Sequence, residues 1–292
     1  MKDHLVEWLL EEKKPEVRLR TQVELLKADR EETEKAINLV KNTKTFDKNM
    51  ALLNEKKPWS VCYGLTAFAE WGLTRNEVDI DEYVDWIIEN TGFAIHCGEG
   101  MLLRSLVKLG YGDDKRVENE MKTIFTGLNT DGGFQCISDN KKINDPKRSH
   151  KSCYRLTATY LLLLAELKLH GISLPCEQRF AEYFLKRDVL FRTDNMDEVV
   201  VSGCHNTYFP TDCISHGIQE IVYAMSVLGY GNRPECKRAW DFAQQHMLEN
   251  GKYILTARSS KPYFSIGVKG KENKWITLYM LLAEKYKDGR YQ

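Results

Sequence analysis

The chain has 292 residues, of which 42% are hydrophobic and 29% are charged. This composition is typical of a folded globular protein and excludes an intrinsically disordered chain. Its 42 basic residues balance its 42 acidic residues, so the basic surface that a nucleic-acid partner requires is not expected. The longest apolar run covers only residues 160–165, too short to cross a bilayer. Because the N-terminus also lacks the apolar block of a signal peptide, we expect a cytoplasmic protein with reduced cysteines.

Helical periodicity dominates the whole chain. A first pair of helices is predicted near residues 15–27 and 31–41, where Pro15 suits a helix start. Largely apolar segments, typical of buried helices, follow near residues 59–73, 97–109, 153–167, 212–228 and 274–286. Charge-rich amphipathic segments lie between them, at residues 115–128, 177–187 and 234–248. This alternation predicts buried inner helices with half-exposed helices outside them.

The alternation is also a sequence repeat. Residues 101–114 (MLLRSLVKLGYGDD) and 218–232 (IQEIVYAMSVLGYGN) are alike, and each stretch precedes a charged helix and a glycine-containing turn. A repeat of roughly 40 to 60 residues, with one helix pair in each unit, indicates a solenoid or a closed ring. An open solenoid would need polar capping repeats, so we expect a ring of parallel inner helices.

Four short motifs resemble a known superfamily. Residues 131–135 (DGGFQ) resemble the Asp-Gly-Gly-Trp element of prenyltransferase and squalene-oxidase repeats. Residues 15–21 (PEVRLRT), 109–117 (LGYGDDKRV) and 274–278 (KWITL) resemble stretches of bacterial squalene-cyclase-like proteins, in the same order. The resemblance to the terpenoid-cyclase and protein-prenyltransferase superfamily covers nearly the whole chain. It implies an all-α fold, an α/α toroid whose central cavity holds an isoprenoid chain in characterised relatives.

The expected architecture is therefore one domain over residues 1–292, with five to six helix pairs in an inner and an outer ring. Residues 1–50 form its N-terminal helical pair, and residues 51–292 form the prenyltransferase and squalene-oxidase-like repeats.

The chain also departs from the superfamily. Class II cyclases carry an Asp-x-Asp-Asp proton donor, and the nearest match here, residues 79–82 (DIDE), begins an outer helix, where acidic residues favour the helix dipole. The chain is less than half as long as a typical squalene-type cyclase. Protein prenyltransferases hold zinc with an Asp-x-Cys pair and a histidine, whereas Asp212, Cys213 and His216 have a different spacing. A prenyltransferase would also need a partner subunit.

Cysteines gather near the predicted starts of the inner helices, which open on one rim of a ring. Cys97, Cys136 and Cys153 match cysteines that squalene-cyclase-like proteins carry beside the same motifs, and thiolates are good zinc ligands. We therefore predict a zinc ion on these three residues. The fourth ligand would be water or one of His150, Cys204, His205, Cys213 and His216. Inert core thiols and an iron–sulfur cluster are the alternatives.

The same rim supplies the candidate catalytic residues His150, His205 and Asp212, the histidines as ligands or as a general acid and base. Asp212 also fits a helix cap. Aromatic side chains suit an apolar ligand, and a charge inside a buried helix is costly unless it is paired or lines a cavity. On these grounds the candidate substrate-binding residues are Tyr63, Arg104, Tyr154, Arg155 and Trp275.

Two functions are compatible with these features. The first is a prenyltransferase- or terpene-cyclase-like enzyme acting on an isoprenoid or other apolar small molecule, with zinc activating a thiol or water. The second is a non-catalytic toroid that binds a lipid or a peptide, with a structural metal or none. The missing Asp-x-Asp-Asp motif favours the second over a cyclase, whereas the cysteine-lined rim favours the first over a pure scaffold.

Overall fold

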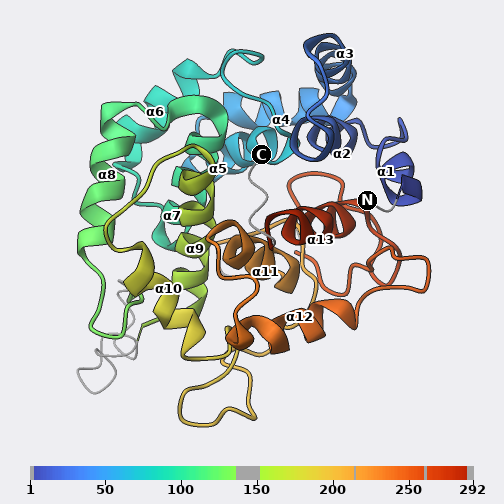
Figure 1. Cartoon of the computed structure of the whole chain (residues 1–292). Helices are drawn as coiled ribbons and strands as arrows, with labels where there is room; N and C mark the ends of the chain where they lie inside the picture. The colour runs from blue at the N-terminus through green and yellow to red at the C-terminus, as the bar shows by residue number, and fades with distance from the viewer. Residues whose placement is uncertain (1–2, 136–151, 214, 260–261, 288–292) are drawn as a thin grey trace.

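The computed structural model describes residues 3–135, 152–213, 215–259 and 262–287 (Figure 1). Within these ranges all regular secondary structure is helical, and the only strand-like pairings are four isolated bridges. The predicted all-α class is therefore confirmed. None of the helices in these ranges combines the length and the apolar character needed to span a membrane.

Six inner elements correspond to the first helix of the predicted N-terminal pair and to the five apolar segments of the sequence. They are α2 (Pro15–Arg20) continued by η1 (Thr21–Leu26), α5 (Pro58–Trp71), α7 (Glu99–Leu106) continued by η3 (Val107–Tyr111), α9 (Tyr154–Leu169), α11 (Ile218–Val227) and α13 (Lys274–Lys287). The outer elements are α3 (Arg30–Lys41), α4 (Lys44–Asn54), α6 (Asp81–Thr91), α8 (Lys115–Thr126), α10 (Glu177–Leu185) and α12 (Lys237–Gln244). The short helices α1 (Asp3–Leu9), η2 (His96–Gly98) and η4 (Pro234–Cys236) complete the described elements.

The inner elements contact one another in cyclic order. α5 packs against α7, α7 against α9, α9 against α11, and α11 against α13. The cycle closes because α13 packs against η1 and α2, and α2 packs against α5. Figure 1 shows α6, α8, α10 and α12 at the periphery of this ring. A cyclic order of inner helices with others outside is what a toroid requires, and it leaves no exposed end that would need a capping repeat.

The sequence accounts for most helix boundaries. α2 and α5 begin with a proline, whose missing N–H costs nothing in the first turn. The side chain of Asp29 accepts a hydrogen bond from the N–H of Glu32 (2.9 Å) and so caps α3. α5 ends at Gly72, which is left-handed (φ 80°). α9 is buried almost all round, as its run of apolar residues predicts.

Two parts of the predicted helix pattern were wrong. The predicted N-terminal pair omitted two helices, α1 and α4. α11 begins at Ile218 rather than at residue 212. The Glu220 carboxylate accepts a hydrogen bond from the N–H of Gly217 (3.2 Å). This bond places the N-cap of α11 at Gly217, so Asp212, Cys213 and residues 215–217 precede the helix.

The Asp-Gly-Gly turn of the repeat motif ties α8 to α9. The Asp131 carboxylate accepts hydrogen bonds from the hydroxyl (2.5 Å) and the N–H (3.2 Å) of Ser152 and from the N–H of Gly133 (3.2 Å). Gly132 is left-handed (φ 90°), and a Cβ on it would lie 2.6 Å from the carbonyl oxygen of Arg179. The motif therefore has a structural role, fixing where α9 begins.

Candidate functional site

Three charged side chains and one tyrosine, from four inner elements, meet inside the ring. The Arg104 guanidinium of α7 lies 2.9 Å from a carboxylate oxygen of Glu70 on α5, and Arg20 of α2 lies 3.2 Å from the other. The Tyr279 hydroxyl of α13 donates to Glu70 (2.6 Å) and accepts from Arg104 (3.0 Å). All four side chains are buried. The buried charges therefore satisfy one another, as burial demands.

A glutamate of α9 extends this network. Glu166 lies 3.4 Å from Lys108, 3.4 Å from His170 and 4.0 Å from Arg104. Burial acts to raise its pKa, but Lys108, His170 and Arg104 outweigh burial and lower the pKa to about 2. Glu166 is thus ionised at neutral pH, and the network reaches the C-terminal end of α9.

Three of the predicted substrate-binding residues lie in packed surroundings. Arg104 belongs to the ion-pair network. Trp275, 1% exposed, stacks on Phe209, with ring centroids 5.0 Å apart. The half-buried Tyr63 lies between Trp59 (5.4 Å) and Tyr263 (4.9 Å).

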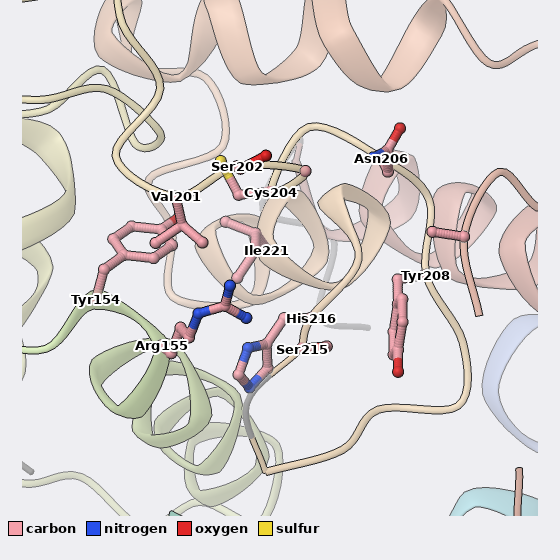
Figure 2. Close-up of a pocket in the computed structure, with 12 residues that line it drawn as sticks. Tyr154, Arg155, Val201, Ser202, Cys204, Asn206, Tyr208, Ser215, His216 and Ile221 are labelled. Carbon is pink, nitrogen blue, oxygen red and sulfur yellow. The ribbon is translucent and has the colours of Figure 1, made fainter. Parts of the chain in front are cut away.

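A pocket of about 220 Å³ lies at the N-terminal ends of α9 and α11 (Figure 2). α9 contributes Tyr154 and Arg155, two of the predicted substrate-binding residues. The rest of the wall comes from the loop before α11, from α11 itself and from one residue beyond α12. These residues are Val201, Ser202, Gly203, Cys204, Asn206, Tyr208, Ser215, His216, Ile221 and Ala257.

Backbone contacts hold the α9 side of the pocket in place. The N–H of Cys153 donates to the carbonyl oxygen of Phe134 (2.7 Å), and the N–H of Phe134 donates to the hydroxyl of Thr157 (3.0 Å). The Tyr154 hydroxyl donates to the carbonyl oxygen of Val189 (3.1 Å). Arg155 follows directly in the first turn of α9, so its position depends on these contacts.

Arg155 and His216 lie next to each other on one side of the pocket. Figure 2 shows the Arg155 guanidinium beside the His216 ring. Burial, followed by the positive charges of Arg104 and Arg155, lowers the pKa of His216 to about 3. His216 is therefore neutral at pH 7, and its Nε2 lies 2.9 Å from the hydroxyl of Thr159. The pocket thus combines a permanent cation with an uncharged imidazole.

The facing wall carries uncharged hydrogen-bonding groups. The Tyr208 hydroxyl donates to the Asp212 carboxylate (2.6 Å). Burial and this neighbouring carboxylate raise the pKa of Tyr208, so the phenol stays protonated. Burial also raises the pKa of the Cys204 thiol, which disfavours the thiolate that a nucleophile requires. The pocket is polar, positively charged and without a ready nucleophile.

The other predicted site residues are spread along the rim. Asp212 accepts a hydrogen bond from Tyr208 but is not itself part of the pocket wall. His205 packs its ring against Phe242 of α12, with centroids 5.5 Å apart, and is not part of that wall. His150 lies outside the described residues. The catalytic roles of all three remain predictions.

The predicted zinc ligands remain untested. Cys97 and Cys153 are half-buried and lie within one turn of the starts of α7 and α9, as expected. Cys136 lies outside the described residues. The part of the chain that the structure describes contains no group of three or more His, Cys, Asp or Glu side chains placed to hold a metal ion. No role that we assign therefore depends on zinc.

The segment nearest to the cyclase proton-donor motif, residues 79–82, lies at the start of an outer helix, as the sequence predicts. Asp81 begins α6, pairs with Arg75 (3.0 Å) and accepts a hydrogen bond from the hydroxyl of Tyr111. The bond from Tyr111 is the largest cause that lowers its pKa. An ionised carboxylate in the first turn supports the helix-dipole interpretation of the DIDE segment.

Several pocket residues were not among those predicted from the sequence. Ser202, Asn206 and Ser215 lie in an irregular segment, where no periodicity indicates which side chains face inward. One sequence signal bore on this segment: Gly217 is followed three residues later by Glu220. This spacing favours a helix start at that glycine and separates the loop from α11.

Comparison of the chain with protein-family models, with curated proteins and with solved structures finds no match. The resemblance to squalene-cyclase-like proteins therefore rests on the short motifs and their order.

Proposed function

We propose that this protein binds a small anionic molecule in the pocket between the starts of α9 and α11, with Arg155 as the main contact. The observation that carries the proposal is the pairing of Arg155 with a neutral His216 and a protonated Tyr208 in one pocket. A guanidinium offers several N–H donors in a plane that matches a carboxylate or a phosphate. Tyr208, Ser202 and Asn206 add uncharged hydrogen-bonding groups.

The size of the pocket limits the ligand. Its volume of about 220 Å³ is below the roughly 300 to 1,000 Å³ of sites for drug-sized molecules. A small metabolite or the head group of a larger molecule fits that space better than an entire isoprenoid does.

The charged interior of the ring disfavours binding of an isoprenoid chain there. An isoprenoid chain needs an apolar cavity, whereas ion pairs of Arg20, Glu70 and Arg104 occupy the interior. Placing an apolar chain there would break charge pairs that are buried and mutually satisfied, which is costly. We therefore prefer a binding function at the rim to the prenyltransferase- or cyclase-like activity that the motifs imply.

The test is titration calorimetry with phosphate, pyrophosphate and succinate as probes. Replacing Arg155 by methionine keeps a flexible, unbranched side chain and removes the charged guanidinium. Loss of a charged hydrogen bond costs about 1.5 to 3 kcal/mol, so we expect R155M to bind the preferred probe at least about tenfold more weakly.

The matched control is R233M, because Arg233 is exposed and pairs only locally with Glu235. Circular dichroism would verify that both variants fold. Unchanged affinity in folded R155M, or no binding of any probe to the wild type at millimolar concentration, would overturn the proposal.

A further inference from the structure

A second cavity, of about 580 Å³, lies at the other end of the ring. Its wall includes the residues that follow three inner elements: Lys27 after η1, Gly72 after α5, and residues 170–171 after α9. The first pocket lies at the start of α9. With 16 residues in α9 and a rise of 1.5 Å per residue, the two sites are about 24 Å apart.

Four lysines from four inner elements line this cavity: Lys27 follows η1, Lys108 is in η3, Lys168 is in α9 and Lys285 is in α13. Of the carboxylates in the described residues, only those of Glu24 and Glu166 share the wall with them.

Two of the lysines have carboxylate partners. Lys108 is 3.4 Å from Glu166, and Lys168 is 3.2 Å from Glu177. The carboxylate of Glu24 is engaged elsewhere, because both its oxygens accept hydrogen bonds from Arg20 (2.5 and 2.9 Å).

Lys27 and Lys285 are not neutralised in this way. Lys285 donates to the backbone carbonyl oxygen of Glu24. No carboxylate of the described residues lies within ion-pair distance of either ammonium group. Burial and the neighbouring charge of Lys27 lower the pKa of Lys285, and Glu24 acts in the opposite direction. The two lysines therefore repel each other.

Helix C-termini favour cations, which offers a structural reason for lysines at this end. One C-terminal carbonyl oxygen in each of two of these helices accepts a backbone hydrogen bond from the residues that follow the helix. Leu73 N–H donates to Phe68 at the end of α5 (3.1 Å), and Ile172 N–H donates to Leu167 at the end of α9 (2.9 Å). The repulsion between Lys27 and Lys285 indicates more positive charge than the carboxylates here compensate.

The remaining wall is apolar and aromatic. Val23, Leu169, Tyr223 and Tyr286 contribute it, and Val23 is 43% exposed. This surface suits the uncharged part of a molecule whose anionic group lies among the lysines.

We infer that this cavity is a second ligand site, which takes a phosphorylated small molecule with adjacent negative charges, its phosphates between Lys27 and Lys285. A lysine ammonium group binds phosphate as a point charge. Lys27 and Lys285, which have no carboxylate partner among the residues that the structure describes, supply the charge that such a group requires. The inference does not depend on the function proposed for the first pocket.

The test measures pyrophosphate binding by titration calorimetry at low ionic strength, where lysine contacts are least screened. The variant is K27N/K285Q, in which asparagine tolerates the left-handed backbone of residue 27 (φ 53°). We expect its pyrophosphate affinity to fall at least tenfold. K115Q is the matched control, because Lys115 is 83% exposed on α8 and outside the cavity.

A second measurement uses the unaltered protein. Pyrophosphate should slow acetylation of Lys27 and Lys285, read by mass spectrometry, and leave Lys115 unaffected. The inference is overturned if K27N/K285Q binds as the wild type does, if K115Q loses as much affinity, or if neither cavity lysine is protected. Loss of pyrophosphate binding in R155M, with K27N/K285Q unchanged, would instead assign this probe to the first pocket.

Discussion

At the scale of single residues, Glu220 links the ring interior to the first pocket. Its side chain is fully buried and accepts hydrogen bonds from the Thr211 hydroxyl and the Gly217 N–H. Burial raises its pKa to about 7, although Arg104 acts to lower it; the charge of Glu70 adds to the rise. Glu220 therefore titrates near neutral pH in the first turn of α11, four residues after pocket residue His216.

We predict that Glu220 makes the fold less stable as the pH rises. A carboxyl group whose folded pKa lies above its unfolded value of about 4.5 binds protons more tightly in the folded state. The protonated Glu220 side chain stabilises the fold fully below pH 4.5, and this stabilisation is lost as the pH rises through 7. By pH 8 the loss in the free energy of unfolding amounts to roughly 3 kcal/mol.

The measurement is urea unfolding between pH 5 and pH 8 for the wild type and for E220Q, which resembles the protonated carboxyl group. We expect the stability advantage of E220Q over the wild type to grow across that range. The control E31Q changes an exposed glutamate of α3 and should follow the wild type. If the free energies of unfolding of E220Q and the wild type change with pH in parallel, Glu220 is not the group that titrates near pH 7.

At the scale of elements, the turn between α8 and α9 positions one side of the first pocket. Gly133 is packed so closely that a Cβ on it would lie 2.6 Å from the Ser152 Cβ and 2.7 Å from the Tyr183 ring. Ser152 immediately precedes Cys153 and the first turn of α9. A displacement here would therefore move Tyr154 and Arg155 together.

We predict that G133A destabilises the protein by about 1 to 3 kcal/mol, the usual cost of overpacking, and also weakens anion binding at the first pocket. Thermal unfolding and the calorimetric titration measure these two effects. The control is G112A, where the backbone has helical dihedrals and the nearest atom would lie 3.5 Å from the new Cβ. A G133A protein that matches G112A in both measurements would show that the turn does not control α9.

At the scale of the whole molecule, stability depends on closing the ring. The last inner helix, α13, packs against α11 on one side and against η1 and α2 on the other. The ends of the chain are thus joined by core contacts, and the ion pairs among Arg20, Glu70 and Arg104 add contacts across the interior. A substitution that removes core contacts of α13 should therefore destabilise every repeat.

We predict that L282A, at a fully buried position of α13, lowers stability by about 2 to 5 kcal/mol and leaves unfolding as one transition. Hydrogen exchange should show amides of α2 and α11 losing protection together. The control is L39A, at a position 40% exposed on α3. Its free energy of unfolding should stay within about 0.5 kcal/mol of the wild-type value. Separate unfolding of the α13 region would indicate an open array of repeats instead.

The sequence by itself determined the helical class and most of the helix positions, because helix periodicity and end signals such as Pro15 are local. It also located Arg155 and Tyr154, which begin a helix whose position is clear from its apolar run. Predictions that need Cys136 or His150, including the zinc site, remain predictions.

The tertiary structure decided what the charged residues do. Arg104 was predicted to contact a ligand. In the folded chain it instead pairs with Glu70, which lies on a different helix and 34 positions earlier in the sequence. The pocket wall depends in the same way on an irregular loop that brings His216 beside Arg155. Neither pairing has a signature in local sequence, because each forms only when separate helices pack around one interior.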